Sequence, residues 1–248
     1  FENVAFGLRL KKLPKPEIAS RVEEGLNTVG LSHLADRKPA EMSGGQQQRL
    51  SLARSLVMEP KVLLLDEPLS NLDARLRLEM RTELQRVQRD TGITMVFVTH
   101  DQSEALALAD RIVLMKDGEI EQLGTPDDLY NRPETAFAAD FFGFENIFEV
   151  VGSKLSGKSG SVALGFDAEE GHVAWRPGAV LLGSGAHMGT VRGVAFAGEQ
   201  REYVIDSDLG QITASSPAGD NAYEIGASLA FDLPKTAALS IAKSSKAV

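Results

Sequence analysis

Residues 41–77 read "EMSGGQQQRLSLARSLVMEPKVLLLDEPLSNLDARLR" and decide the fold. Residues 44–58 are predicted to form a helix, because apolar side chains recur on one face at helical spacing. The run "KVLLLDEP" that follows is apolar up to its two carboxylates and ends at Pro68. A strand that is apolar at every position is typical of a parallel sheet buried on both faces. The stretch therefore predicts an α/β fold.

The predicted helix begins with a candidate anion site. Ser43 stands at the N-cap position and Gln46 at capping-box spacing, so a well-capped helix is one interpretation. Gly44 and Gly45 favour a second one, because residues without side chains leave backbone N–H groups open to an approaching anion. The helix dipole contributes about 0.3–1 kcal/mol to such binding. Ser43, Gly44, Gly45 and Gln46 are therefore candidate phosphate-binding residues.

Two adjacent carboxylates, Asp66 and Glu67, end the predicted strand. A lone Asp at such a place is often a cap or turn residue, but open α/β sheets bind ligands at the carboxyl ends of their strands. Successive residues point to opposite sides of a strand, so the two carboxylates can have different roles. We expect Asp66 to hold Mg²⁺, directly or through water. We expect Glu67 to accept a proton from an attacking water molecule.

His100 ends a second apolar run, "ITMVFVTH", at residues 93–100. If the two strands are parallel, His100 lies at the same edge of the sheet as Asp66. There it could contact a γ-phosphate or position the water molecule; a purely structural histidine is the alternative interpretation. Asp73, in "SNLD", is interpreted as the N-cap of the next helix.

The flanking segments extend the α/β pattern. Helical periodicity predicts helices over residues 16–30 and 74–90. Further predictions are a helix over residues 101–110 with a capping box of Asp101 and Glu104, a hairpin that turns at Asp117 and Gly118, and a helix that begins at Thr125 and Pro126.

The sequence pattern changes near Gly143. Short alternating runs with glycine-bearing turns replace the helical periodicity, which predicts a small all-β sandwich or barrel. We therefore predict two domains, at residues 1–142 and 143–240. Trp175 is interpreted as a core or interface residue, and Arg176 as a candidate oxyanion site.

Composition excludes several classes of protein. The chain has 248 residues, 43% of them hydrophobic and 25% charged, with a net charge of −9 and no cysteine. An acidic chain is a poor candidate for binding nucleic acid. It contains no apolar run of about 18 residues, so no membrane span is predicted. The absence of cysteine excludes disulfides and fits a reducing compartment.

The order and spacing of these motifs closely resemble the nucleotide-binding subunit of ABC transporters over residues 1 to about 142. In that family "SGGQ" is the signature motif, "LLLDE" is Walker B, "SNLD" is the D-loop and "VTH" carries the switch histidine. The resemblance implies ATP and Mg²⁺ as cofactors. It makes Asp66 the magnesium-associated carboxylate, Glu67 the catalytic base and His100 the switch residue. Ser43–Gln46 and Asp73 would contact ATP across a dimer interface.

Residues 137 to about 235 resemble, more weakly, the OB-like TOBE domain of importer ATPases for polyamines, ferric iron, sulfate, molybdate or sugars. The implied partners are a second copy of the subunit, two transmembrane permease subunits and, indirectly, a periplasmic or extracellular substrate-binding protein, with no nucleic acid. The implied location is peripheral, at the cytoplasmic face of the cell membrane. The segment "FENVAFGL" is expected to border the face that meets the permease subunits.

The Walker A pattern G-x-x-x-x-G-K-[ST] does not occur in the 248 residues. Without this loop the chain lacks the Walker A lysine and the backbone N–H groups that bind the β- and γ-phosphates. We therefore expect the chain alone to bind ATP weakly and not to hydrolyse it. Two alternatives stay open: a truncated, non-catalytic product with a dimerisation or regulatory role, and a remote DNA-repair or chromosome-type ATPase.

Overall fold

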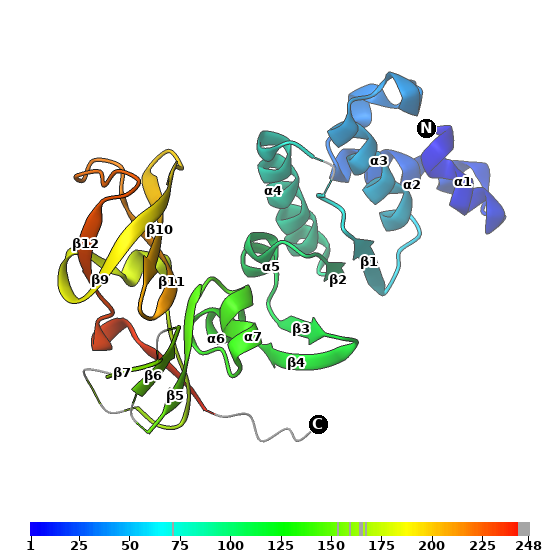
Figure 1. The fold of residues 1–248 in the computed structure, drawn as a ribbon. Helices are drawn as coiled ribbons and strands as arrows, with labels where there is room; N and C mark the ends of the chain where they lie inside the picture. The colour runs from blue at the N-terminus through cyan, green and yellow to red at the C-terminus, as the bar shows by residue number, and fades with distance from the viewer. Residues whose placement is uncertain (71, 153, 159, 164–165, 167, 243–248) are drawn as a thin grey trace. The chain divides into compact units, whose positions relative to one another are not determined.

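The described part of the chain divides between residues 109 and 110 (Figure 1). The structure is a computed structural model that describes residues 1–70, 72–152, 154–158, 160–163, 166 and 168–242. The first unit is Phe1–Ala109 and the second is Asp110–Val248. The predicted domain boundary between residues 142 and 143 stays a prediction.

The first unit packs helices against a two-stranded parallel sheet. Its helices are α1 (Glu2–Leu10), α2 (Lys15–Thr28), α3 (Gly44–Leu56), α4 (Ala74–Thr91) and α5 (Gln102–Leu108), with short 3₁₀ turns at Ser32–Leu34 and Pro39–Glu41. The strands are β1 (Val62–Asp66) and β2 (Thr94–Val98). The helices α2, α3, α4 and α5 and both strands lie within two or three residues of their predicted ranges, so the predicted α/β pattern is confirmed. Helix α1 and the two 3₁₀ turns were not predicted.

The long helix α4 shows how the sequence sets these elements. Its apolar stripe is buried at Met80, Leu84 and Val87 and half-buried at Leu76. The helix ends at Gly92, whose φ of 64° lies in the left-handed region that glycine adopts without steric cost. The stripe packs into one core together with Leu63 of β1.

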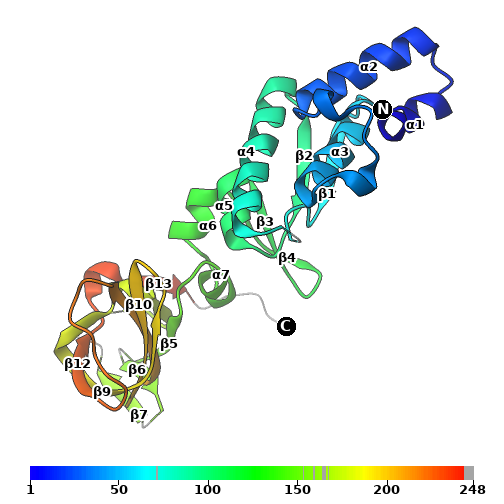
Figure 2. The same ribbon diagram turned by 90° about the horizontal axis from the view of Figure 1, so that it is seen from above.

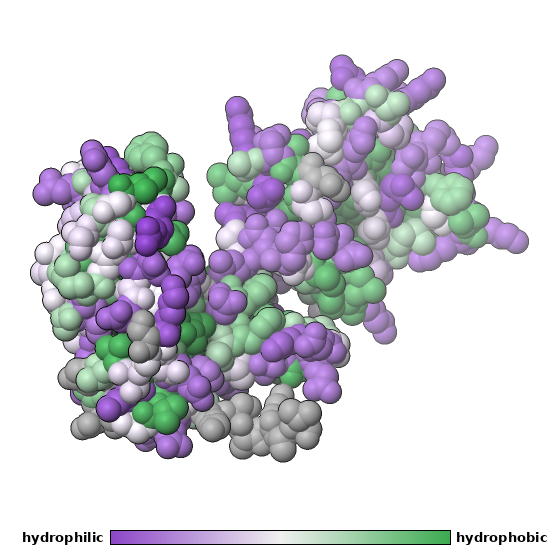
Figure 3. All heavy atoms as spheres, viewed as in Figure 1, coloured by the Kyte–Doolittle hydropathy of each residue, from purple (hydrophilic) through white to green (hydrophobic). Residues whose placement is uncertain are grey.

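One prediction about the sheet is wrong. The apolar runs predict burial on both faces, yet Leu64 is 74% exposed and Val98 is 54% exposed. Val62 and Val96 lie on the same open face. Within the first unit, helices cover one face of the sheet, and no described segment of that unit covers the other. Figure 3 shows hydrophobic surface where Figure 1 places β1 and β2.

Helix α5 also differs in detail from the prediction. Asp101 caps it as predicted, accepting hydrogen bonds from the N–H groups of Ser103 (2.7 Å) and Glu104 (3.2 Å). The Glu104 carboxylate does not complete the capping box. The buried carboxylate instead accepts a hydrogen bond from the hydroxyl of Thr99 at 2.7 Å and lies 3.7 Å from Nε of Arg77.

The Asp101 cap makes stability depend on pH. The Ser103 hydroxyl, together with the backbone N–H groups of Glu104 and Ser103, lowers the pKa of the Asp101 carboxyl from its ordinary value of 3.8. A lowered carboxyl pKa stabilises the fold above the unfolded pKa of about 3.9, and this stability is lost as the pH falls through the folded pKa. We expect Asp101→Asn, which keeps a capping side chain, to flatten the fall of the urea midpoint below about pH 4. An unchanged acid slope in that variant would contradict the assignment.

The second unit begins with a hairpin and two short helices. Strands β3 (Ile112–Lys116) and β4 (Glu119–Gly124) turn at Asp117 and Gly118, whose φ values are 51° and 84°. This confirms the predicted turn, because such hairpins need positive φ at both central residues. Helices α6 (Pro126–Asn131) and α7 (Ala136–Phe141) follow, and Thr125 caps the first of them as predicted.

The rest of the second unit is two antiparallel sheets, which confirms the predicted all-β region. The strands are β5 (Asn146–Val151), β6 (Lys154–Gly157), β7 (Gly160–Ala163), β8 (Gly171–Trp175), β9 (Leu181–Phe196), β10 (Gln200–Ser207), β11 (Gly210–Pro217), β12 (Ser228–Asp232) and β13 (Leu239–Ala242), with 3₁₀ turns at Pro177–Ala179 and Lys235–Ala237. The strand orders are β13-β8-β5-β6-β7 and β11-β10-β9-β12. Figure 2 shows both sheets arranged around a shared interior.

The second unit contains Trp175 and Arg176, two residues for which the sequence predicted a role. Trp175 is fully buried in the β core, as predicted. Arg176 lies between the rings of Tyr130 and Phe144, with its guanidinium carbon 3.8 and 4.1 Å from their centroids. Its two terminal nitrogens donate to the carbonyls of Tyr130 and Phe142. The guanidinium is thus engaged by rings and carbonyls, and burial lowers its pKa.

Candidate functional site

The carboxyl ends of β1 and β2 bring together three of the predicted site residues. The two strands are parallel, with Asp66 opposite Val98, so the predicted common edge is confirmed. Glu67 follows β1 and His100 follows β2 after one intervening residue. Oε1 of Glu67 lies 3.2 Å from Nδ1 of His100. A carboxylate and an imidazole at this distance can share a proton, which is the geometry of an acid–base pair.

The backbone directs Glu67 away from the strand. Its N–H donates to the carbonyl of Val98 at 2.9 Å, which keeps it on the β2 side. Its φ is 41°, a left-handed conformation that is uncommon for a residue with a side chain. The hydroxyl of Ser70 donates to the Glu67 carbonyl at 3.0 Å and closes the turn. Strain of this kind is concentrated at functional sites, where the surrounding structure holds it.

Asp66 is exposed at the end of β1, and the described residues give it no ion-pair partner. A free carboxylate at this edge suits a magnesium ion that keeps most of its water and takes its other ligands from phosphates. No cluster of three or more histidine, aspartate or glutamate side chains in the described ranges could hold a metal by itself. The donor set therefore fits a metal that arrives with a phosphate ligand.

The amino end of α3 carries the predicted capping box. The Ser43 N–H donates to Oε1 of Gln46 at 3.0 Å, and the Gln46 N–H donates to Oγ of Ser43 at 3.4 Å. The cap leaves the N–H groups of Gly44 and Gly45 without a partner among the described residues. Both the capping interpretation and the anion interpretation are therefore compatible with this helix end.

The two glycines of this motif differ in their surroundings. A Cβ atom at Gly45 would lie 2.4 Å from Cδ1 of Leu76 on α4, whereas one at Gly44 would meet nothing within 4 Å. We expect Gly45→Ala to destabilise the fold by about 1–3 kcal/mol through overpacking. The matched Gly44→Ala is expected to change it by less than about 0.5 kcal/mol. Urea unfolding of both variants measures the difference, and equal midpoints would contradict the contact.

Asp73 caps α4, as predicted, and accepts from the N–H of Leu76 at 3.0 Å. It is exposed and lies near the turn that follows Glu67. Asn71, the second residue of "SNLD", lies outside the described residues. Sequence patterns gave no indication of Gln48, whose side-chain amide donates to the carbonyl of Pro68. That bond ties α3 to the turn behind Glu67.

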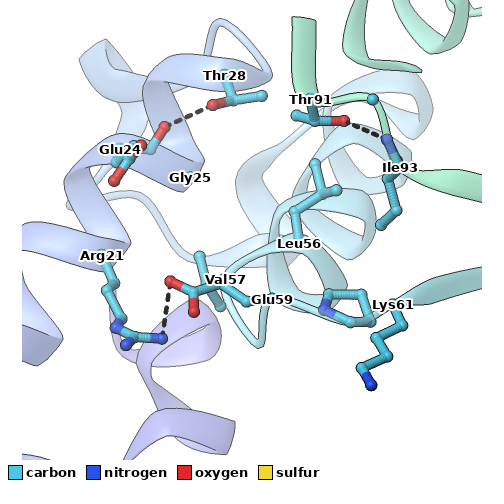
Figure 4. A pocket seen from close by; sticks show the side chains of 12 residues that line it. Arg21, Glu24, Gly25, Thr28, Leu56, Val57, Glu59, Lys61, Thr91 and Ile93 are labelled. Atoms are coloured by element: carbon cyan, nitrogen blue, oxygen red, sulfur yellow. Dashed lines mark hydrogen bonds and ion pairs between the residues drawn. The ribbon is translucent and has the colours of Figure 1, made fainter. Parts of the chain in front are cut away.

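A cavity of about 430 Å³ lies elsewhere in the first unit (Figure 4). It is lined by Lys61 just before β1 and Ile93 just before β2, which places it at the amino ends of the strands. Arg21 of α2 pairs with Glu59 at 3.0 Å within its lining. The catalytic candidates Glu67 and His100 are at the opposite ends of the same strands, so this cavity is separate from their site.

Comparison with known proteins places these features in a family. Residues 1–70 match the family model described as "ABC transporter". The chain is 47% identical over 227 residues to the Fe(3+) ions import ATP-binding protein FbpC of Rhizobium etli. This chain belongs to the ABC transporter ATP-binding proteins.

Other relatives agree with this assignment. The chain is 46% identical over 216 residues to the spermidine/putrescine import ATP-binding protein PotA of Borreliella afzelii. The FbpC alignment covers 85% of this chain and 64% of that protein, and the PotA alignment covers 83% and 62%. The chain thus spans less than two thirds of the length of either relative.

A solved structure gives the same assignment by shape. It is cbiO1 of Clostridium perfringens, described as part of the ABC transporter complex cbiONQ. The likeness has a TM-score of 0.50 and a sequence identity of 38%, over 52% of this chain and 51% of that one.

Proposed function

We propose that the chain is the ATP-handling part of an ABC importer subunit. The single observation that carries this proposal is the Glu67–His100 pair, 3.2 Å apart at the carboxyl edge of a parallel sheet. Asp66 ends the strand beside the pair, and a helix with free amino-terminal N–H groups lies in the same unit. Family membership adds ATP as the ligand that this arrangement serves.

Each residue has a distinct role in the proposed reaction. Glu67 accepts a proton from the water molecule that attacks the γ-phosphate. His100 holds the Glu67 carboxylate in place through its Nδ1. Asp66 would hold Mg²⁺, which would supply charge neutralisation at the phosphates.

The signature residues serve a second copy of the subunit. Ser43, Gly44, Gly45 and Gln46 are proposed to contact the ATP of the partner subunit in a homodimer, and Asp73 to border the same interface. The exposure of Gly44 and the open space around it support this, because a phosphate must approach the backbone closely. Closing the dimer over two ATP molecules then drives the transport step.

The wider assembly follows from the relatives. One relative imports ferric ions and another imports spermidine and putrescine, so a ferric or polyamine cargo is proposed here. No helix within the described residues is long and apolar enough to cross a membrane. We propose a peripheral place at the cytoplasmic face, on two permease subunits that receive cargo from a binding protein. Phe6 and Leu10, which are 61% and 69% exposed on α1, suit contact with those subunits.

The β region, proposed as a TOBE-like domain over residues 143–240, has a dimerisation or regulatory role in this proposal. A purely non-catalytic chain is the second candidate. The observation that favours it is the absence of a Walker A pattern from the 248 residues. The two candidates differ in whether Asp66, Glu67 and Ser43 act on ATP at all.

A chimera separates these candidates. A segment that carries the Walker A pattern G-x-x-x-x-G-K-[ST] is fused before Phe1, and ATP binding and phosphate release are measured beside the chain alone. We expect the chimera to bind and hydrolyse MgATP, and the chain alone to bind it weakly without turnover. Ser43→Arg in the chimera is expected to abolish turnover, because the side chain would block the amino end of α3.

Two results would count against the proposal. A folded chimera that binds no ATP would favour the non-catalytic role. Steady-state hydrolysis by the chain alone, lost in Glu67→Gln, would show that the site needs no added phosphate loop.

A further inference from the structure

Glu104 is a buried carboxylate that the proposed chemistry does not use. Its exposed fraction is 3%, on the first turn of α5. A buried charge is costly unless charged or hydrogen-bonding partners surround it. Glu104 has two such partners: the Thr99 hydroxyl donates to Oε2 at 2.7 Å, and Nε of Arg77 lies 3.7 Å from Oε1.

Arg77 reaches Glu104 from the first turns of α4. Its Nη2 donates to the carbonyl of Leu72 at 3.1 Å, just before the Asp73 cap. Its Nη1 lies 4.0 Å from Oδ2 of Asp101. Nε is buried and has no hydrogen-bond partner among the described residues, so Glu104 is its nearest charge. One guanidinium therefore spans from the turn before α4 to the start of α5, two helices that pack together.

The Thr99 hydroxyl carries this network to His100. It donates to Glu104 and accepts from the N–H of Asp101 at 3.0 Å, which uses its one donor and one of its acceptor sites. The residues on both sides of His100 are thus held by one hydroxyl. The His100 side chain is itself 73% exposed and its one described polar contact is with Glu67. Its position is therefore set by the backbone at Thr99 and Asp101.

We infer that Arg77 and Glu104 are positioning residues that hold His100 against Glu67 and tie it to the Leu72–Asp73 turn. The importance of His100 and Glu67 for ATP rests on the proposed function. The geometric inference does not, because it concerns contacts within this chain. Its consequence is that a shift of the Leu72–Asp73 turn reaches His100 through one guanidinium and one buried carboxylate.

The test follows the imidazole ¹⁵N signal of His100 at one fixed pH, in the 248-residue chain without an added phosphate loop. The chain has four histidines, so His100→Gln assigns the signal. Glu67→Gln gives the shift that follows when the carboxylate partner is lost. We expect Arg77→Met and Glu104→Gln each to move the signal in that same direction by at least half as much. The double variant should add little to either single change, since both act in one network.

A matched control separates positioning from simple attachment of the two helices. The Gln85 amide on α4 donates to the carbonyl of Ala107 on α5 at 2.8 Å, away from Thr99 and Glu104. Gln85→Ala therefore loosens the same pair of helices, and we expect it to leave the His100 signal unchanged. Thr99→Val, which removes the hydroxyl at nearly constant shape, serves if Arg77→Met or Glu104→Gln fails to fold; it should move the signal like Glu67→Gln.

Three results would overturn the inference: a His100 signal unmoved by the network variants, one moved equally by Gln85→Ala, or one unmoved by Glu67→Gln. None of these measurements uses nucleotide. If the network variants move the His100 signal but the chimera binds no ATP, only the proposed function is rejected. If they leave the signal unmoved while the chimera hydrolyses ATP normally, only the positioning role is rejected.

Discussion

Trp175→Ala is expected to unfold the β region at temperatures where the parent chain is folded. The indole is fully buried, and its ring lies 6.2 Å from that of Phe148 and 6.3 Å from that of Phe166. Its N–H donates to the carbonyl of Pro234 at 3.0 Å. Removing a buried Trp costs about 3–5 kcal/mol, and the orphaned carbonyl adds about 1–3 kcal/mol if it stays buried. These sums approach the whole stability of a small domain.

The measurement is amide hydrogen exchange of the β-region strands, because loss of the single Trp removes the fluorescence signal. Protection at Tyr203, Ile205 and Ile212, all fully buried, should collapse. The matched control is Phe196→Ala, which truncates a large ring that is 71% exposed, and it should change stability by less than about 0.5 kcal/mol. Protection retained in Trp175→Ala would mean that the core is not organised around the indole.

Much of this architecture could be predicted from local pattern. Periodicity located α4 and the buried stripe that it carries, and the Asp117–Gly118 pair located the hairpin turn. The common edge of Asp66 and His100 was predicted on the condition that the two apolar runs form parallel strands, and they do. Such features depend on residues close together in sequence, and the local sequence pattern contains the information that predicts them.

The features that escaped prediction join residues far apart. Glu104 has capping-box spacing to Asp101, yet its carboxylate is taken by Thr99 and approached by Arg77, a residue of another helix. No local pattern indicates the partner of Asn146, which is buried and exchanges two hydrogen bonds of 2.8 Å with the backbone of Thr213. Burial of the β1 face was mispredicted for a related reason: an apolar run indicates that a face needs cover, not which segment supplies it.

Glu67→Gln in the phosphate-loop chimera is expected to lower ATP turnover by about 10²–10⁴-fold, the usual contribution of a positioned general base. The amide keeps the shape of the side chain and its reach to His100 but cannot accept the proton of the attacking water molecule. ATP binding should survive, because the substitution removes a negative charge near the phosphates. A loss confined to kcat therefore separates a base from a binding residue. Turnover and ATP affinity are measured on the same sample.

The matched control is Glu79→Gln, which neutralises a carboxylate on α4 that pairs with Arg75 at 3.1 Å and belongs to no part of the site. It should leave kcat unchanged.

The position of His100 allows a second comparison, because its Nδ1 lies 3.2 Å from the carboxylate that Glu67→Gln neutralises. If Glu67 is the base and His100 only holds it, His100→Ala should lower kcat by less than Glu67→Gln, and the double variant should be no slower than Glu67→Gln alone. A double variant slower by the product of both effects would instead make His100 an independent contributor at the γ-phosphate. Full turnover in Glu67→Gln would remove this carboxylate from the reaction and leave Asp66 as the remaining acidic candidate.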